Sequence, residues 1–307
     1  MFKKATKKDR SGVFAAVTLH STGLRYLEIS GHTGAFKVVR QAVIPVSRAA
    51  HADNIASLLS REVGKFNDPV VFGLPMRDCM IRVIEYPRMP IEDALKALQF
   101  DFDKHFTWSY SECTVDACEV ESPLTSSKDN MSMLVAACRN EHISRILQIT
   151  ERANMELKAI EPMNVSVLRA IIGPKSRKEA WYSIYSDAEG LHFAFVDNDN
   201  GLFYRSGPVG INGIIDTSNE EELVRAVTEV QRTISFVANQ FKKGAPAAGV
   251  VVLSGAIVNN PDVVKAIEGA VELKVETVNV YEQCGITPAD SAVLGVGFEP
   301  ALGLCMF

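Results

Sequence analysis

Residues 17–26, VTLHSTGLRY, read as a strand, a tight polar turn and a second strand. They belong to a longer pattern, because VFAAVTL, LRYLEIS and FKVVRQAVI alternate or run apolar and are separated by the polar turns HSTG and GHTG. A helix over residues 51–66 and the apolar strand VVFGLP come next along the chain. This order predicts three meandering strands followed by a helix and a fourth strand.

The same order of elements returns in the second half of the sequence. AWYSIYS, LHFAFV and LFYRSG are strand-like, with the turns DAEG and NDNG between them, and Asn200-Gly201 is typical of a two-residue hairpin. A long helix over residues 220–242 and the strand GVVVLSG follow. The apolar stripe of this helix has steps of three and four and consists of Leu223, Val227, Val230, Ile234, Val237 and Phe241. The duplication predicts an α/β fold with two similar lobes.

Two facing α/β lobes enclose a cleft, and ligands of open α/β sheets bind beyond the strand ends. We expect the turns HSTG and DAEG to meet across this cleft. Residues 13–75 and 161–178 are assigned to the first lobe, and residues 179–307 to the second. Residues 76–160 are not part of the duplication, and their two strand–helix pairs with a strand between them predict a small inserted α+β module.

The composition is that of an ordinary globular protein, with 47% hydrophobic and 22% charged residues among 307. The net charge of −5 gives no electrostatic reason to expect a nucleic acid as partner. No apolar run approaches the ~18–20 residues that span a bilayer, and the N-terminus lacks the apolar core of a secretory signal. These features predict a cytosolic protein that its own chain does not anchor in a membrane.

The basic start of the chain, its cysteines and its histidines give no sign of catalysis. MFKKATKKDR favours a solvated, flexible tail over residues 1–12, with a weak contact to anionic lipid as the alternative. The six cysteines are scattered without a C-x-x-C pair, which fits a reducing compartment and predicts no metal site. Asp101 and His105 stand four apart on a predicted helix, where a solvated helix face is favoured over an acid–base pair.

One stretch is more specific than the rest: VVFGLPMRDCMIRVIEYPRMPIEDALKALQFDFDKHF has a strand ending in Leu-Pro, an Arg-Val-Ile-Glu-x-Pro strand and a helix that opens with acids. EPMNVSVLRAI, VRAVTEVQRTISFVANQF, VVLSGAIV and PADSAVLGVGF follow it in order. This pattern resembles the PilM proteins of type IV pilus assembly, members of the actin-like superfamily that includes the cell-division protein FtsA. The similar segments cover nearly the whole chain from Val13.

The resemblance implies a two-lobed actin-like (ribonuclease H-like) fold with one inserted subdomain. It also implies a cytoplasmic protein at the inner face of the cytoplasmic membrane. Such a protein binds the short N-terminal segment of a membrane partner, PilN, in a groove between the first lobe and the inserted module. The hexameric motor ATPases of pilus extension and retraction are further expected partners. Members of the family usually bind ATP with magnesium.

The resemblance allows the first phosphate-binding turn to be compared position by position. Actin-like folds hold the phosphates between two hairpin turns, which need small residues for backbone contact and an aspartate for magnesium. Thr18 stands where the family has aspartate, His20 where it has glycine, and Arg25 replaces a lysine. Ser21 and Thr22 are still compatible with phosphate. The first turn is therefore degenerate.

The second turn departs from the family in the same direction. Tyr185 falls at its aspartate and Asp187 at a glycine, and Gly190 is the last residue of the turn. In either register of this comparison, Asp187 or Glu189 brings a carboxylate near the phosphates. Its repulsion is roughly 1–4 kcal/mol per unit charge at ~4 Å.

The third element of the family's nucleotide site is a run of three glycines on which adenosine lies. It reads Gly255-Ala256-Ile257 here, and Ile257 brings a branched side chain to a slot built for none. ATP with magnesium is possible from the resemblance, but these departures together predict that neither is a cofactor and that no catalytic residue is present.

The partner-peptide groove has its candidates at the start of the module, namely Met76, Met80, Arg82 and Tyr86. An extended chain can add to an unpaired strand edge through main-chain hydrogen bonds. Methionine suits an adaptable peptide surface, although a core role for either methionine is equally compatible with the sequence.

The function predicted is a cytoplasmic scaffold of a type IV pilus or secretion platform, which captures a PilN-like tail without ATP turnover. One alternative is an active Mg-ATP-binding actin-like ATPase of the same machinery. Another is the cytoplasmic scaffold of a type II secretion system, although that protein normally carries a membrane helix. A sugar-kinase-like enzyme would need a carboxylate base in the cleft, and none can be assigned.

Overall fold

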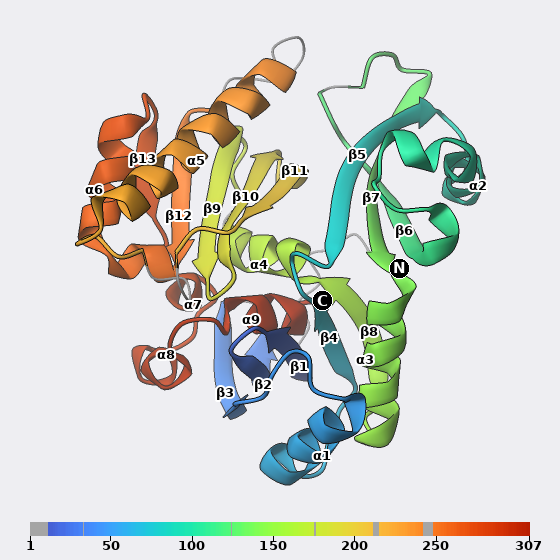
Figure 1. Cartoon of the computed structure of the whole chain (residues 1–307), viewed down its shortest axis with the longest axis vertical. Helices are drawn as coiled ribbons and strands as arrows, with labels where there is room; N and C mark the ends of the chain where they lie inside the picture. Colours follow the sequence, from blue (N-terminus) through green and yellow to red (C-terminus); the bar gives the residue numbers. More distant parts are fainter. Residues whose placement is uncertain (1–11, 33, 124, 175, 211–214, 242–247) are drawn as a thin grey trace.

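The computed structural model contains two five-stranded sheets and one three-stranded sheet (Figure 1). It describes residues 12–32, 34–123, 125–174, 176–210, 215–241 and 248–307. Residues 1–11 of the predicted tail lie outside the described part of the chain. The strands are β1 Gly12–His20, β2 Gly23–His32, β3 Ala35–Ile44, β4 Val70–Leu74, β5 Cys79–Pro87, β6 Cys113–Val120, β7 Asn130–Arg139, β8 Leu157–Pro162, β9 Trp181–Asp187, β10 Gly190–Asp197, β11 Asn200–Gly207, β12 Val250–Gly255 and β13 Lys274–Thr277. The helices are α1 Ala52–Val63, α2 Ile91–Asp101, α3 Asn140–Arg152, α4 Met163–Ile172, α5 Glu220–Gln240, α6 Pro261–Ala270, α7 Val280–Gln283, α8 Pro288–Leu294 and α9 Glu299–Cys305.

The first lobe is built on the sheet β3-β2-β1-β4-β8. β1 pairs antiparallel with β2 and parallel with β4, as a meander followed by a helical crossover requires. The register pairs His20 with Gly23, so Ser21 and Thr22 form a two-residue turn. Gly23 has a φ of +128°, and a Cβ there would lie 2.4 Å from the carbonyl oxygen of Ile44. Only glycine fits this position.

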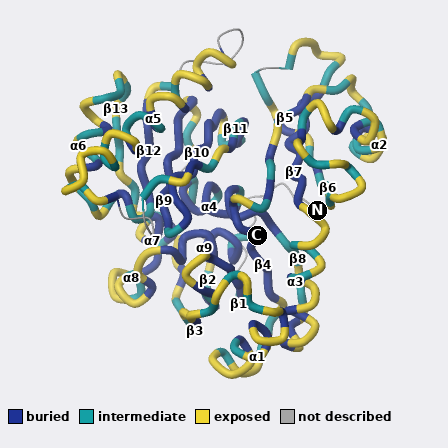
Figure 2. Tube along the Cα trace, viewed as in Figure 1, coloured by how far each residue is buried: buried dark blue, intermediate teal, exposed yellow. Residues whose placement is uncertain are grey.

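The second lobe repeats the first, with the sheet order β11-β10-β9-β12-β13. β9 pairs antiparallel with β10 and parallel with β12, which confirms the predicted duplication. α5 has its predicted apolar stripe, since Val230, Val237 and Phe241 beyond its end are buried in the main core. Figure 2 shows that the central strands of both lobes are buried along most of their length.

The inserted module consists of the sheet β5-β7-β6 and the helix α2. α2 and the residues after it cover one face, where Leu98, Phe102 and Phe106 form an apolar cluster with strand residues. On the other face Ile81 and Leu134 belong to the main core, which includes much of the second lobe. β5 contacts β11, and Figure 1 shows the two strands beside one another.

The predicted end of the module at residue 160 is wrong, because α3 and β8 belong to the first lobe. β8 pairs parallel with β4 and is the last strand of the first sheet. Ile146 and Ile149 of α3 are buried in the same cluster as Ile55 and Leu59 of α1. The module sheet therefore ends with β7 at Arg139, and the strand–helix pattern of the sequence could not show which sheet the helix covers.

The second predicted boundary also differs, since α9 lies on the first lobe and not on the second. α9 packs against α4, β1 and β4. A Cβ at Gly303 would lie 1.8 Å from the carbonyl oxygen of Ser166, so the two helices touch through their backbones. Arg169 of α4 donates to the carbonyl oxygen of Gly303 at 2.8 Å and pairs with Glu161. The chain thus returns to the lobe in which it began.

Candidate functional site

The turns HSTG and DAEG meet between the two lobes, as predicted. The backbone N–H of Ser21 donates to Glu189 Oε1 at 2.7 Å. The other carboxylate oxygen, Oε2, lies 3.4 Å from Nη1 of Arg48, and the backbone carbonyl of Glu189 accepts from Arg77. Three donors from the first lobe and the start of the module therefore converge on Glu189, whose side chain is 3% exposed.

The carboxylate of Glu189 occupies the kind of environment that a bound anion would need. A backbone N–H of a tight turn and a guanidinium are common ligands of phosphate and carboxylate groups. Here the anion is part of the chain, and it joins one lobe to the other. The sequence predicts a carboxylate from Asp187 or Glu189 at this place. It does not indicate that the turn of the first lobe would bind this carboxylate.

Behind this contact lies a buried polar row that starts at Thr18 and His20. His20 Nε2 is 2.9 Å from Thr18 Oγ1, and its Nδ1 is 3.9 Å from Asp187 Oδ2. Asp187 Oδ1 accepts from the backbone N–H of Glu189 at 2.8 Å and from His192 Nε2 at 2.9 Å. With its Nε2 protonated, His192 has Nδ1 free to accept from the hydroxyl of Ser206, 2.8 Å away.

Burial controls the charges in this row. Burial, followed by the nearby charges of Arg25, His192 and Arg48, lowers the pKa of His20 to about 3, against the attraction of Asp187. His20 is therefore neutral near pH 7. Burial alone would raise the pKa of Asp187, but the attraction and the hydrogen bond of His192 lower it. The row therefore contains one carboxylate and a neutral His20. A neutral His20 provides no positive charge that could attract a phosphate.

The next residues inward come from β9, from β2 and from the start of α9 with the turn before it. Tyr185 is fully buried, and its hydroxyl lies 3.4 Å from Oε2 of Glu299. Burial raises the pKa of Glu299, although the backbone N–H of Gly297 donates to its Oε2 at 2.7 Å. Arg25 lies under Gly297, and its Nε and Nη1 are buried without a hydrogen-bond partner among the described residues.

The segment Gly255-Ala256-Ile257, at the predicted position of the glycine run, does not form the open slot that the sequence suggested. Gly255 has a φ of +77°, and a Cβ there would lie 2.2 Å from the carbonyl oxygen of Ser186. The short helical turn Ala256–Asn259 follows, and the backbone N–H of Ile257 donates to Ser186 Oγ at 2.7 Å. The side chain of Ile257 is 2% exposed and lies in the main core. Ile257 thus packs inward, and it does not fill an open slot as the sequence suggested.

Apart from Gly255, Ala256 and Ile257, the predicted nucleotide-site residues fall into two groups. Those that the structure brings into the inter-lobe contact are Thr18, His20, Ser21, Arg25, Tyr185 and Asp187. Thr22 and Gly190 serve as turn residues, and a Cβ at Gly190 would lie 2.3 Å from the carbonyl oxygen of Gly207. Sequence reasoning missed Arg48, Arg77, Asp78, His192 and Glu299, because they come from segments that no local motif connects.

The candidates for a peptide groove are not all on the surface. Met76 is 3% exposed and belongs to the main core, so it has the core role that the sequence left open and is not accessible to a peptide. Met80 and Tyr86 are half-buried beside the module cluster, and the Tyr86 hydroxyl donates to Asp101 Oδ1 at 2.5 Å. Arg82 is exposed on β5. β5 and β6 are the two edge strands of the module sheet.

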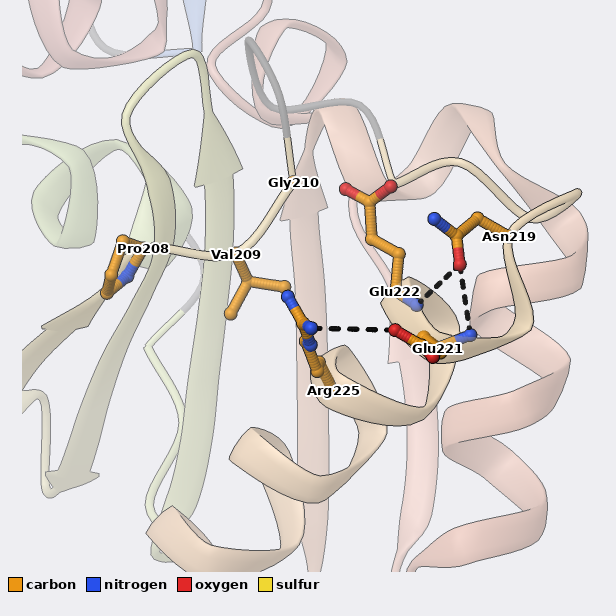
Figure 3. A pocket seen from close by; sticks show the side chains of 7 residues that line it. All are labelled: Pro208, Val209, Gly210, Asn219, Glu221, Glu222 and Arg225. Carbon is orange, nitrogen blue, oxygen red and sulfur yellow. Dashed lines mark hydrogen bonds and ion pairs between the residues drawn. The ribbon is translucent and has the colours of Figure 1, made fainter.

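Two further features bear on ligands. No group of three His, Cys, Asp or Glu side chains that could hold a metal ion lies together in the described ranges. A hollow of about 310 Å³ at the start of α5 is lined by Pro208, Val209, Gly210, Asn219, Glu221, Glu222 and Arg225 (Figure 3). The side chain of Asn219 caps the helix there by accepting from Glu221 N and Glu222 N. None of the lining residues belongs to the two turns.

Comparison with solved structures identifies the fold. Over 97% of its length the chain superposes on 98% of a chain in a PilM–PilN type IV pilus biogenesis complex, with a TM-score of 0.77 and 17% identity. For the cytoplasmic domain of EpsL, an inner membrane component of the type II secretion system of Vibrio cholerae, the TM-score is 0.53 with 10% identity, covering 89% of this chain and 93% of that one. A Bacteroides thetaiotaomicron protein with an actin-like ATPase fold and unknown function gives 0.53 at 7% identity, with 95% of each chain covered. No protein-family model and no curated protein matches the sequence. The expected actin-like fold is confirmed.

Proposed function

We propose that this actin-like chain is a scaffold of a type IV pilus or related secretion platform. In this role it binds the cytoplasmic N-terminal tail of a PilN-like inner-membrane protein and does not turn over ATP. Its place is the cytoplasmic face of the inner membrane, with the motor ATPases of the machinery as further partners. The observation that carries the proposal is the agreement of the whole chain, inserted module included, with a protein from a PilM–PilN complex.

The inter-lobe contact supports a role without nucleotide. In an actin-like fold the phosphates lie between the two turns, and here Ser21 and Arg48 already bind the carboxylate of Glu189. A phosphate would have to displace that carboxylate and remain beside Asp187, which is 1% exposed. Without a well-held cation the repulsion between these anions is not offset.

The module supplies the surface for the tail. β5 is an edge strand whose exposed Arg82 stands on the face that also carries Met80 and Tyr86. An extended peptide can bind to an edge strand by main-chain hydrogen bonds, with side chains adding specificity. In the described residues, no helix combines the length and the apolar character needed to cross a bilayer.

The test is binding of a fluorescent peptide that carries the N-terminal tail of a PilN-like membrane protein. We expect saturable binding, and Arg82→Gln should weaken it about fivefold, since a contacting arginine contributes about 1 kcal/mol or more. Arg225→Gln changes an exposed arginine on α5 and is the matched control, which should bind like the wild type. The scaffold role is wrong if no tail binds, and the assigned surface is wrong if both variants lose affinity equally.

A further inference from the structure

Arg48 stands where three parts of the molecule meet. It lies in the loop after β3 of the first lobe and pairs with Asp78, in the turn that leads into β5 of the module. Its Nη1 also faces Glu189 of the second lobe at 3.4 Å. One guanidinium therefore bridges a carboxylate of the module turn and a carboxylate of the second lobe, and both carboxylates are largely buried.

The loop that carries Arg48 is fixed to the first lobe. Arg145 of α3 donates to the backbone carbonyls of Arg48 and of Ala50, the latter at 2.6 Å. His142 of the same helix lies with Nδ1 3.6 Å from Asp78 Oδ2. The first lobe thus holds Arg48 in place, whereas its two acidic partners belong to parts that are joined to the lobe by turns.

The module and the second lobe also touch directly. Arg77, next to Asp78, donates to the backbone carbonyl of Glu189, and β5 contacts β11. If the second lobe rotated away from both the first lobe and the start of β5, Glu189 would lose Ser21, Arg48 and Arg77 together. Separating one partner of a largely buried charged pair leaves the other uncompensated, so the contact is either made or fully broken.

We propose that Arg48, Asp78 and Glu189 form a latch that couples closure of the second lobe to the position of the inserted module. In the closed state Glu189 holds Arg48 and Arg77, and Arg77 and Asp78 fix the start of β5. Opening the lobes frees the start of β5, and displacement of β5 releases Glu189 from the first lobe. This coupling belongs to the chain itself and does not depend on what binds the module.

Hydrogen–deuterium exchange of the whole chain tests the latch. Glu189→Gln keeps the shape of the side chain but removes its charge, and it should raise amide exchange about tenfold in residues 20–24. The latch requires a parallel rise in residues 76–84, on the module side. Glu268→Gln removes an exposed carboxylate on α6 of the same lobe and should leave both segments unchanged.

A second variant, Asp78→Asn, distinguishes coupling between the module and the two turns from a purely local effect of a substitution. Asp78→Asn changes the module side of Arg48, together with the contact of Asp78 to His142 of α3, and the latch predicts faster exchange in residues 20–24 and 187–190 of the two turns. Changes confined to residues 76–84 in this variant, or to residues 20–24 in Glu189→Gln, would overturn the proposal. Unchanged exchange in α5 and α6 confirms that a variant is folded. If either variant unfolds, Arg48→Lys is measured instead. The latch then requires faster amide exchange both in residues 20–24 and in residues 76–84.

Discussion

His20 shows how a histidine side chain is accommodated between the two lobes. It is fully buried, it contacts Thr18 and it faces Asp187 without the short distance of a strong ion pair. A charged imidazole at this depth would lie near Arg25 and Arg48, so the neutral form is preferred. The side chain of His20 is thus uncharged in the folded state and packs between the lobes.

The stability of the protein should fall as the pH is lowered from 7.5 to 5. The pKa of His20 is about 3 in the folded state, against an ordinary value of 6.5 for a solvated histidine, so below pH 6.5 the unfolded chain binds a proton that the folded chain does not. The expected contribution of His20 to this loss is about 2 kcal/mol. Urea denaturation at both pH values measures it.

His20→Asn is the variant that isolates this contribution. The raised pKa of Glu299 acts in the opposite direction, because the folded protein then takes up its proton more readily, but it acts in both proteins. The variant should therefore lose less stability than the wild type over the same pH interval. An equal loss in the two proteins would show that His20 is protonated in the folded state or is exposed.

At the scale of elements, α9 packs closely against α4. Its backbone meets that of α4 at Gly303, and Arg169 of α4 links the two helices by donating to the carbonyl oxygen of Gly303. Arg169 also donates to the carboxylate of Glu161 on β8. The side chains of Leu302, Leu304 and Cys305 are buried as well. α9 therefore packs on the first lobe, against α4, β1 and β4.

Gly303→Ala should destabilise the protein by about 2 kcal/mol or more, because its Cβ would meet the carbonyl oxygen of Ser166 at 1.8 Å and neither backbone can move without loss of packing. Gly269→Ala is the matched control on α6, where a Cβ would find no atom within 4 Å. That change should stabilise the protein by about 0.5–1 kcal/mol. Both values follow from denaturation midpoints, and similar effects of the two substitutions would contradict the close approach of α9 and α4.

At the scale of the whole molecule, the two lobes are closed on each other by groups of the chain. The contact of Ser21 with Glu189 lies at the surface of a buried row that continues through His20 and Asp187 to His192. The module adds a further contact between β5 and β11. The chain's own hydrogen bonds and ion pairs thus join the two lobes in this structure.

Mg-ATP at about 1 mM should therefore leave the Tm unchanged. A working site with a Kd one hundredfold below the ligand concentration would stabilise the protein by about 2.7 kcal/mol, which is a readily measured shift. Scanning fluorimetry with Mg-ATP, and with magnesium alone as the control, distinguishes the two cases. A Tm that rises only with the nucleotide present would favour the actin-like ATPase alternative.

The sequence by itself determined the elements and their repetition. Alternating or continuous apolar residues marked β1, β2, β9 and β10, and a period near 3.6 marked α5, because both patterns depend on neighbours a few residues apart. The resemblance of ordered motifs then gave the two-lobed fold with its inserted module, and it drew attention to the turns that meet in the structure. It also placed Thr18, His20 and Asp187 at the contact.

Only the tertiary structure decided how distant segments are shared among the lobes. Strand pairing assigned β8 to the first sheet, and backbone packing brought α9 back to the first lobe. Met76 and Ile257 turned inward because burial depends on what covers a residue, which no local pattern contains. The bridge from Asp78 through Arg48 to Glu189 joins segments far apart along the chain, and charges find one another across such distances only once the chain has folded.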